Sequence, residues 1–594
     1  MSDALVFRLY SPRKAARRFT STYTKTIMLN PVPSDSEPRA AQTIRSLFDH
    51  DCRFKIPSYQ RSYSWERKQR KQFIEDLTEH PHGAPYYYGH FIFEDGEENN
   101  VALIIDGQQR LTTLVLFLSA VDRELAGRDD VSTADLDSLK RRYLTGRLET
   151  VDDDQNVFLD LIRKGTTADR SKGRSKERLN DAGRFFSKVA NRADTAVLLR
   201  WVEILETAEI TTFTVHSKVQ ATQIFTLQNS RGKELTDLEK LKAFLMFGIY
   251  LHASPAKKNG AIGQVERSFG KIYQRIEHVS LMNEDAVLGH HDRAYSQPPH
   301  HADTPLENIR KRLAGIAASE DRVNEITDYA ESLAATFQHV VDLEKIIGQE
   351  AVIADPVILD GHNSWPLLIK LYCYYGEALK NDAKMRTLLQ NVEIVFLKLR
   401  FQHGRSSNDL IDMTKHLDDS PERLDALCER MKQCVSQGFR WRGDFDQKVQ
   451  SQLDGNYHYN SIYRYILWKY ENWQRRDGDA VISPAEYLNL IEKRRMDSTI
   501  EHIAPQNGDY PEKFRSQWLN NLGNLLLMPR GMNSSLSDKP PVDKANELDT
   551  SYKSHREVRD IISAAGGWTE HQIKTRKDEL VSFIQQRWRV TPSV

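Results

Sequence analysis

The stretch LIIDGQQRLTTL, residues 103–114, decides how the first part of this chain folds. Its apolar start predicts a buried strand that ends at Asp106, and Gly107 permits a tight turn with an unusual backbone angle. A helix predicted over Gln109 to Leu125 follows, with its first amide groups unpaired and its positive dipole end exposed. A strand, a glycine turn and a helix start in this order predict a site for an anion.

The side chains around this turn favour a phosphate as that anion. Gln108, Gln109 and Arg110 add hydrogen-bond donors, and a guanidinium holds a phosphate through two parallel hydrogen bonds. Asp106 has the chemistry to hold a metal ion or a ribose hydroxyl. The pattern GxxxxGK[ST] does not occur in the sequence, which excludes a P-loop NTPase. The alternative is a plain strand-to-helix connection with a capping aspartate.

Two further polar loops strengthen the phosphate interpretation. One is IPSYQR, residues 56–61, which two more aromatic residues follow. The other is NSRGK, residues 229–233. Each loop lies beside an apolar element and carries Arg, Gln or Asn, so we expect the three loops to line one pocket. The aromatic side chains of the first loop either accept a modified base, stack on a nucleotide or pack in the core; they are Tyr59, Tyr63 and Trp65.

Hydrophobic periodicity places regular elements on both sides of these loops. Thr236 and Glu239 form the capping box of a helix that follows the NSRGK loop. The basic segment 163–178, with seven basic and two acidic residues, is interpreted as a solvated loop, or alternatively as a loop that contacts phosphate. Helices are predicted over residues 40–48, 68–80, 221–228 and 238–250, and strands over residues 86–93, 101–105 and 211–215.

These blocks resemble a known domain family. IPSYQRSYSW, YYYGHFIFE, IIDGQQRLTTL and ATQIFTLQNSRGKELTDLEKLKAFL are similar, in the same order, to four blocks of the DGQQR-domain family. That family forms the N-terminal half of GmrSD-type type IV restriction enzymes and of SspE-like phage-defence proteins. The resemblance implies a fold similar to that of ParB and sulfiredoxin, with NTP binding and hydrolysis that regulate DNA cleavage. The nucleotide-binding residues that we predict are Tyr59, Gln60, Arg61, Asp106, Gly107, Gln108, Gln109, Arg110, Asn229 and Arg231.

A second constellation lies near the C-terminus. The segment STIEHIAP predicts a strand that carries Glu501 and His502, and residues 522–528 predict a second strand before a helix near Asn533. In such a site His502 takes a proton from water, and Glu501 and Asn533 hold one Mg²⁺ or Mn²⁺ through oxygen ligands. The metal would stabilise the phosphate in the transition state. The alternative is a packed histidine on a half-buried strand.

The order of these residues resembles the ββα-metal, or HNH, nuclease motif. Asn524 follows His502 by 22 residues (524 − 502), and Asn533 follows Asn524 by 9 (533 − 524). The resemblance implies a catalytic site in which His502 is the general base, Asn524 braces the loop, and Lys544 meets the transition-state phosphate. Two departures from the common motif are Glu501 in place of Asp and Asn533 in place of His. No CxxC pair flanks the motif, so packing alone must hold this finger.

Length and composition agree with a multidomain protein, and the resemblance to phage-defence proteins implies the bacterial cytoplasm. The chain has 594 residues, and its 83 Lys and Arg balance 83 Asp and Glu, so binding to nucleic acid must rely on local basic patches. Four cysteines without CxxC spacing indicate a reducing compartment. The longest apolar run, residues 111–121, is too short to span a bilayer, and we expect no membrane partner.

The expected fold is a mostly helical, multidomain α+β protein. Its parts are a flexible basic N-terminus (residues 1–39), a ParB-like α/β domain that binds NTP (40–255), a helical connecting region (256–440) and a C-terminal helical domain with an HNH-type nuclease finger (441–594). The sequence leaves open whether translation starts at Met1 or Met28.

Two other segments have competing interpretations. HHDRAYSQPPHH, residues 290–301, is interpreted as a surface loop, with metal binding as the alternative. An aromatic segment with interleaved basic residues forms a helix core or clamps nucleic acid, and in a mixed arrangement Arg464 faces DNA. The members of this segment are Tyr457, Tyr459, Tyr463, Arg464, Tyr465, Trp468, Lys469 and Tyr470.

Together these patterns predict an NTP-regulated, metal-dependent DNA endonuclease of phage defence, with modified phage DNA as its target. A regulatory DNA-binding protein without nuclease activity is the first alternative, and an RNA-cleaving suicide effector is the second. The sequence leaves open which NTP, ATP or GTP, is bound and which DNA modification is recognised. It also leaves open whether hydrolysis activates or restrains cleavage, whether one or both strands are cut, and whether the chain forms a homodimer.

Overall fold

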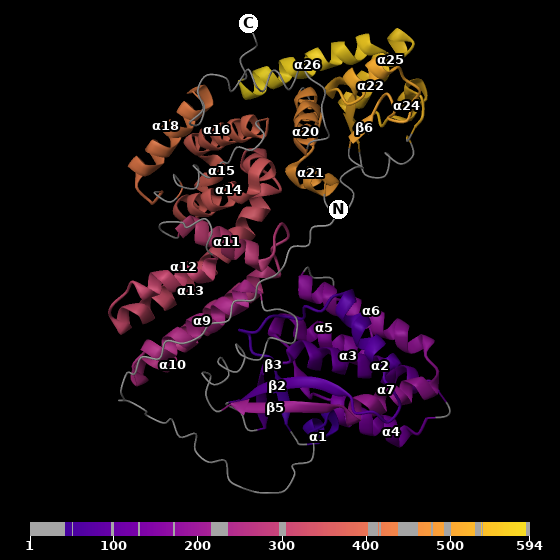
Figure 1. Ribbon diagram of the computed structural model, residues 1–594, viewed down its shortest axis with the longest axis vertical. Coiled ribbons are helices and arrows are strands. Elements are labelled where there is room, and N and C mark those ends of the chain that lie inside the picture. Colours follow the sequence, from indigo (N-terminus) through magenta and orange to yellow (C-terminus); the bar gives the residue numbers. More distant parts are fainter. Residues whose placement is uncertain are drawn as a thin grey trace, which may run out of the picture.

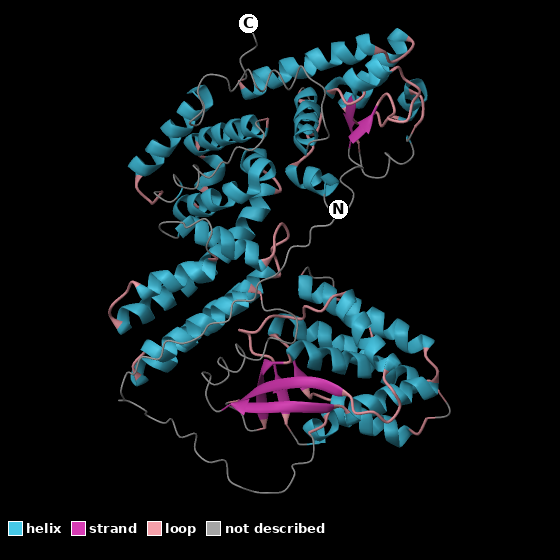
Figure 2. Ribbon diagram, viewed as in Figure 1, coloured by secondary structure: helices cyan, strands magenta, loops and turns pink. Residues whose placement is uncertain are grey.

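The computed structural model shows a largely helical chain with a small amount of sheet (Figures 1 and 2). The expectation of a mostly helical, multidomain α+β protein is confirmed. Asn229, Arg231 and Asn533 of the predicted sites, and the helix predicted over 221–228, lie outside the described residues. The structure describes residues 42–49, 52–96, 100–128, 131–169, 173–215, 236–295, 304–401, 414, 417–437, 461–476, 479–491, 500–528, 536 and 538–589.

The N-terminal domain is built on a five-stranded mixed sheet. Its strands, in spatial order, are β4 (Leu148–Glu149), β1 (Arg53–Lys55), β3 (Val101–Asp106), β2 (Tyr87–Asp95) and β5 (Glu209–Val215). β1 pairs in parallel with β3 and β4, and β2 pairs in parallel with β5, whereas β2 and β3 are antiparallel. The strands predicted at 86–93, 101–105 and 211–215 are thereby confirmed as β2, β3 and β5.

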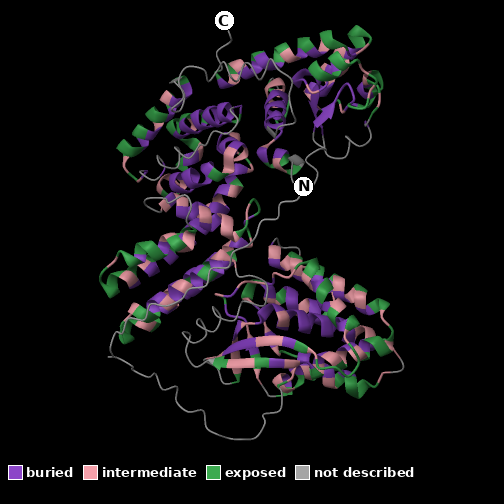
Figure 3. Ribbon diagram, in the orientation of Figure 1, coloured by how far each residue is buried: buried purple, intermediate pink, exposed green. Residues whose placement is uncertain are grey.

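Helix α3 (Gln108–Leu125) is the centre of this domain. Every residue from Leu111 to Asp122 is buried, because other elements of the domain pack around this helix on several sides (Figure 3). The same core contains strand residues such as Phe54, Phe91 and Ile104. The other helices of the domain are α1 (Ile44–Asp49), α2 (Arg67–Glu79), α4 (Thr133–Leu139), α5 (Asp152–Lys164), α6 (Arg174–Arg192) and α7 (Thr195–Thr207).

A helical region follows and begins with α9 (Asp237–His252) and α10 (Pro255–Ile276). The predicted capping box of Thr236 and Glu239 opens α9. In Figure 1, α9 and α10 lie between the N-terminal domain and the remaining helices. Those helices are α11 (Glu284–Tyr295), α12 (Pro305–Ala314), α13 (Ser319–Ile347), α14 (Ala351–Tyr375), α15 (Ala378–Asn381), α16 (Ala383–Arg400) and α18 (Pro421–Gln437).

The C-terminal part surrounds a short strand pair, β6 (Ile500–His502) and β7 (Leu525–Leu527). One hydrophobic core runs from Leu238 in α9 to Trp588 near the end of the chain, so the helical region and the C-terminal part share it. No helix among the described residues is long and apolar enough to cross a membrane. The C-terminal helices are α20 (Ser461–Arg475), α21 (Pro484–Ile491), α22 (Glu512–Gln517), α24 (Pro541–Glu547), α25 (Lys553–Ala565) and α26 (Glu570–Trp588).

Buried ion pairs hold the C-terminal helices to the helical region. Lys469 of α20 lies 2.5 Å from Asp355 of α14, and Arg587 of α26 lies 2.8 Å from Glu393 of α16. Tyr465 also donates to Glu393 at 2.8 Å. Burial raises the pKa of Asp355 to about 7, although Lys469 opposes that rise. Each of these carboxylates is therefore held in place by a partner from another helix.

The aromatic segment of α20 is core. Tyr463, Tyr465, Trp468 and Tyr470 are buried, which confirms the packing alternative. The expectation that Arg464 faces DNA is wrong, because only 5% of this residue is exposed. The physical reason is that α20 is covered on several sides, by α14, α25, α26 and β7. Tyr457 and Tyr459 lie outside the described residues.

Two segments interpreted as loops are partly helical. Residues 163–164 end α5 and residues 174–178 form the first turns of α6, so the solvated-loop interpretation is wrong at both ends of that segment. Residues 290–295 belong to α11, where His290 and His291 are buried because their helix packs against α13 and α14. Among the described residues, no group of three or more His, Cys, Asp or Glu is placed to hold a metal ion.

We expect Gly107→Ala to destabilise the N-terminal domain more than Gly146→Ala does. Both glycines have positive φ, +98° and +66°, so alanine costs about 1–2 kcal/mol at each. A Cβ at Gly107 would also lie 2.3 Å from the Phe91 ring, whereas Gly146 has nothing within 4 Å. Overpacking adds about 1–3 kcal/mol to the free energy lost at Gly107. Denaturant unfolding of the two variants measures this difference, and equal losses would contradict it.

Candidate functional site

The first candidate site lies where β3 ends and α3 begins. Oδ2 of Asp106 lies 3.1 Å from His90 Nε2 and 3.4 Å from Arg110 Nη2. The same Nη2 donates to the His90 carbonyl at 2.6 Å, and the guanidinium lies 5.4 Å from the centre of the Phe91 ring. The three polar side chains are partly exposed. Arg110, predicted to bind phosphate, is thus paired with a carboxylate of the protein itself.

The start of α3 presents backbone amide groups that the side chain of the cap residue does not cover, because that residue is Gly107. Gly107 precedes the helix with φ 98° and ψ 2°, and no side chain caps the first turn. The first amide groups of a helix have no partner within it, so they can receive an anion. Gln108, the first residue of α3, is buried. The structure therefore shows the predicted strand, glycine turn and helix start, and anion binding at this helix start stays a prediction.

The two other predicted glutamines hold the loop that follows β1. Gln109 accepts a hydrogen bond from the Ser64 amide at 2.7 Å and donates to the Ser62 carbonyl at 3.0 Å. Gln60 donates to the Ile105 carbonyl at 3.0 Å. Both glutamine side chains are buried. The structure therefore brings this loop against the end of β3 and the start of α3, and Gln60 and Gln109 have a positioning contact there.

Two charged residues of α9 complete this neighbourhood. Nε of Arg61 lies 3.1 Å from Oε1 of Glu239. Nζ of Lys242 donates to the Tyr59 carbonyl at 2.7 Å and lies 4.7 Å from the centre of the Tyr59 ring. Burial lowers the pKa of Lys242 to about 8, against the opposing charges of Glu266 and Glu239. The sequence pattern did not predict Glu239 or Lys242 as site residues. The signal that could have found them is that these two charged residues lie three positions apart on a mostly apolar helix.

The three aromatic residues of the first loop do not form one cluster. Tyr63 is buried in the N-terminal core and its hydroxyl lies 3.0 Å from Thr113 Oγ1. Trp65 is partly buried against the same core. Tyr59 instead packs on a separate pair formed by Ile92 and Ile105. The packing alternative is therefore confirmed for Tyr63.

The second candidate site lies on the β6–β7 pair. His502 is paired in register with Leu525, and the predicted second strand begins with a 3-10 turn, η4 (Leu522–Asn524). Nε2 of His502 lies 3.0 Å from Oδ1 of Asn520, a residue that the spacing argument does not single out. Burial lowers the pKa of His502, although the contact with Asn520 opposes this. The lowered pKa favours the neutral imidazole, which is the form that can accept a proton.

The carboxylate of Glu501 is paired within the protein. Lys544 of α24 forms an ion pair with Glu501 and donates to the His502 carbonyl at 2.7 Å. The side chains of Glu501 and Lys544 are 9% and 3% exposed. Burial raises the pKa of Glu501, and the charge of Lys544 opposes that rise. Lys544 thus fixes the strand that carries both residues, and a contact with DNA phosphate would require its side chain to leave these partners.

Asn524 ties two segments of this site together. Its Oδ1 accepts hydrogen bonds from the Ala504 amide at 2.8 Å and from Trp568 Nε1 at 2.9 Å. Its Nδ2 donates to the carbonyls of Ala504 at 3.2 Å and Leu519 at 2.8 Å. The amide is fully buried. Asn524 therefore connects the loop after β6 to the turn before β7, which is the geometry of a brace.

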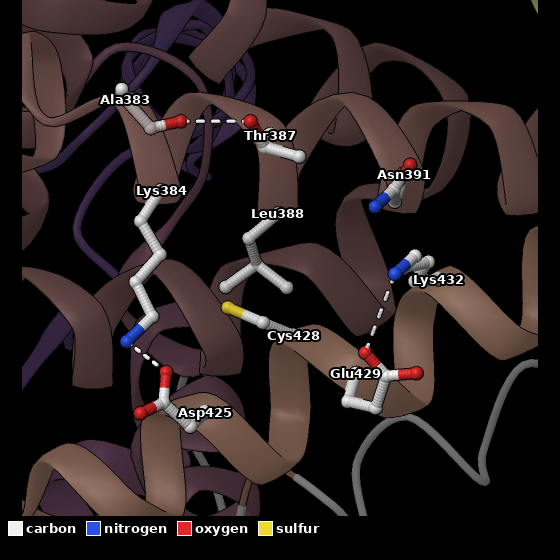
Figure 4. A pocket seen from close by; sticks show the side chains of 9 residues that line it. All are labelled: Ala383, Lys384, Thr387, Leu388, Asn391, Asp425, Cys428, Glu429 and Lys432. Carbon is white, nitrogen blue, oxygen red and sulfur yellow. Dashed lines mark hydrogen bonds and ion pairs between the residues drawn. The ribbon is translucent and has the colours of Figure 1, made fainter.

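A groove of about 570 Å³ between α16 and α18 is separate from both candidate sites (Figure 4). Ion pairs between Lys384 and Asp425 and between Lys432 and Glu429 line it. None of the site residues predicted from the sequence lines this groove. Its walls are Ala383, Lys384, Thr387, Leu388, Asn391, Asp425, Cys428, Glu429 and Lys432.

Comparison with known families matches two parts of the chain to one kind of enzyme. Residues 44–246 match the N-terminal domain of GmrSD restriction endonucleases, and residues 443–583 match their C-terminal domain. Because both domains are present in one chain, the protein is a restriction endonuclease, an enzyme that acts on DNA. The chain belongs to the GmrSD family, as its sequence blocks indicate. A comparison with curated proteins gives no match.

We expect Asn524→Ala to reduce the stability of the C-terminal part by about 2–4 kcal/mol, because buried donors such as the Trp568 indole lose their acceptor. Asn507→Ala is the matched control, since Asn507 contacts Asp538 at an exposed position. We expect that control to stay within about 0.5 kcal/mol of the wild type. Denaturant unfolding measures both changes, and a loss below 1 kcal/mol for Asn524→Ala would contradict the bracing role.

Proposed function

We propose that this restriction endonuclease is regulated by an NTP and cleaves DNA with the help of a divalent metal in an HNH-type C-terminal site. The target that we propose is phage DNA with modified bases or backbone, as in type IV restriction. One observation carries the proposal: His502, whose Nε2 lies 3.0 Å from Asn520 Oδ1, directly follows the buried carboxylate of Glu501 on β6. A proton acceptor next to a carboxylate is what hydrolysis of a phosphodiester requires.

His502 is the proposed general base. Asn520 fixes the orientation of the imidazole, and its carbonyl oxygen favours the tautomer that carries the proton on Nε2. The other ring nitrogen then takes a proton from the water that attacks the phosphorus atom. Lys544 and Asn524 act through the backbone: Lys544 holds the His502 carbonyl, and Asn524 holds Ala504 two residues further on. These contacts keep the base in one position relative to the DNA strand.

The residue types at this site fit a hard divalent cation. Glu501 supplies a carboxylate, and the predicted ligand Asn533 supplies an amide oxygen; both are donor types that Mg²⁺ and Mn²⁺ accept. A metal bound there would stabilise the negative charge that develops on the phosphate. Lys544 already neutralises Glu501, so the carboxylate can serve such an ion only by sharing or leaving this partner.

For the N-terminal site we propose binding and hydrolysis of an NTP in a ParB-like domain. The uncapped start of α3 supports this, because it presents amide groups to a phosphate. Arg110 and Arg61 are the cations beside it, and each is paired with a carboxylate of the protein, Asp106 and Glu239. A phosphate can replace these carboxylates because it is also an anion and accepts hydrogen bonds from a guanidinium.

We expect His502→Ala to lose about 10²–10⁴-fold in the rate of metal-dependent DNA cleavage, because a general base contributes that much. NTP binding should be unchanged, since the nucleotide site lies in another domain. His571→Ala, at an exposed position of α26, is the control and should cleave like the wild type.

The substrates in this assay are plain DNA, modified phage DNA and RNA of matched sequence, each with Mg²⁺ and with or without ATP or GTP. Cleavage that survives His502→Ala would remove His502 from the role of base. Equal digestion of RNA and DNA would contradict the proposal that modified DNA is the target, and it would favour an RNA-cleaving effector.

We expect Arg110→Ala to lower the rate of NTP hydrolysis at least about 100-fold, because a guanidinium that stabilises the charge of the transition state is worth that much. Arg67→Ala, at an exposed position of α2, is the matched control. Release of inorganic phosphate from ATP and from GTP measures both variants. Turnover at the wild-type rate in Arg110→Ala would exclude this residue from the nucleotide site.

A further inference from the structure

The loop after β1, residues 56–61, is predicted to bind nucleotide, and it also contacts the helical region. An added Cβ at Gly270 of α10 would lie 3.6 Å from the Ser58 carbonyl oxygen, so α10 approaches this loop closely. The next residue, Tyr59, has its carbonyl held by Lys242 of α9 at 2.7 Å. A ligand that moves this loop must therefore also change its contacts with α9 and α10.

Glu239 connects Arg61 of this loop to the start of α9. Its Oε1 lies 3.1 Å from Nε of Arg61, and its Oε2 accepts a hydrogen bond from the Thr236 amide at 3.0 Å in the capping box. The side chains of Arg61 and Glu239 are only 17% and 9% exposed, so solvent screens their attraction less than at an open surface. The position of Arg61 is thus tied to the first turn of α9.

A displacement of α9 reaches the nuclease strands through packed side chains. Leu238, Leu241 and Leu245 of α9 belong to the same hydrophobic core as Leu525 and Leu527 of β7. β7 pairs with β6, which carries His502. Because close-packed interiors transmit strain, we expect a displacement of α9 to be felt at β7 through this shared core.

We propose that Arg61 and Glu239 form a phosphate-gated ion pair that couples nucleotide binding to the nuclease domain. This inference rests on the proposed NTP binding and names how that site regulates cleavage. A triphosphate carries more charge than one carboxylate and accepts two parallel hydrogen bonds from a guanidinium, so it takes Arg61 from Glu239. Glu239 keeps its capping bond to Thr236, so α9 stays folded while it loses its tie to the loop.

A second contact between the same two parts of the chain lies away from the nucleotide loop. Oε2 of Glu277, just after α10, accepts from the Ser175 amide at 2.6 Å, and Arg174 donates to the Met282 carbonyl at 2.9 Å. No residue predicted to bind nucleotide takes part in it. We therefore expect this contact to persist, so that α9 and α10 pivot about it when Arg61 is released.

The test compares Glu239→Gln with Asp237→Asn by calorimetric titration of ATP and GTP into the full chain. Glu239→Gln keeps a capping oxygen but loses the charge that holds Arg61, so its Kd for the bound nucleotide should fall by about 5–150-fold, the usual range of coupling between sites. Asp237→Asn removes a carboxylate from the same turn, but Asp237 pairs with the exposed Lys240, so its Kd should stay unchanged.

Two further measurements make the outcome decisive. The ratio of DNA cleavage rates with and without nucleotide should approach one in Glu239→Gln, whichever direction the nucleotide acts in the wild type. In the wild type itself, nucleotide should leave amide hydrogen exchange at Ser175 and in the capping box of Thr236 and Glu239 unchanged, because neither contact involves Arg61. Wild-type Kd and cleavage ratio in Glu239→Gln would overturn the ion-pair gate alone. A wild-type chain that binds neither ATP nor GTP would overturn the proposed NTP binding and the gate with it.

Discussion

A charge that is buried must be paired, and this constraint determines how successive parts of the chain are joined. Arg61 and Glu239 join the N-terminal domain to α9, and Lys469 and Asp355 join α20 to α14. Removing one partner of such a pair costs about 3–5 kcal/mol, because the other charge is left without compensation. An ion pair also requires one geometry, whereas apolar contact tolerates several. The paired charges therefore fix how these helices and the N-terminal domain are positioned where they meet.

Elements whose residue pattern agrees with their burial could be predicted from the sequence. The strand, Gly107 and helix α3 form one local solution, because an apolar strand and an apolar helix can be joined so tightly only through a residue that accepts positive φ. Arg464 and residues 290–295 could not be predicted correctly. Charged and imidazole side chains usually lie at the solvent-exposed surface, but here neighbouring helices cover them. That covering depends on contacts between distant parts of the chain.

The sequence predicted which segments of a candidate site lie close together, but not which side chains contact one another there. Sequence order indicated that the loop after β1 lies beside the start of α3, and Gln109 does reach Ser62 and Ser64 of that loop. Residue spacing does not show where a side chain points. Gln109 was therefore predicted to bind the nucleotide, whereas in the structure its side chain forms hydrogen bonds with the loop. Asn520 was missed for the same reason, because it meets His502 from outside the paired strand residues.

The proposed function requires both candidate sites to bind phosphate, and in both a glutamate already holds a cation that would receive it. Glu239 holds Arg61, and Glu501 holds Lys544. The chain has no net charge, so no long-range field draws a polyanion towards it, and at short range these cations are neutralised. Ordinary DNA therefore gains little from either site, since each new contact replaces an existing one. Under the proposed function, a bound nucleotide and a mark on the DNA would supply this missing free energy, which gives the proposed control a physical basis.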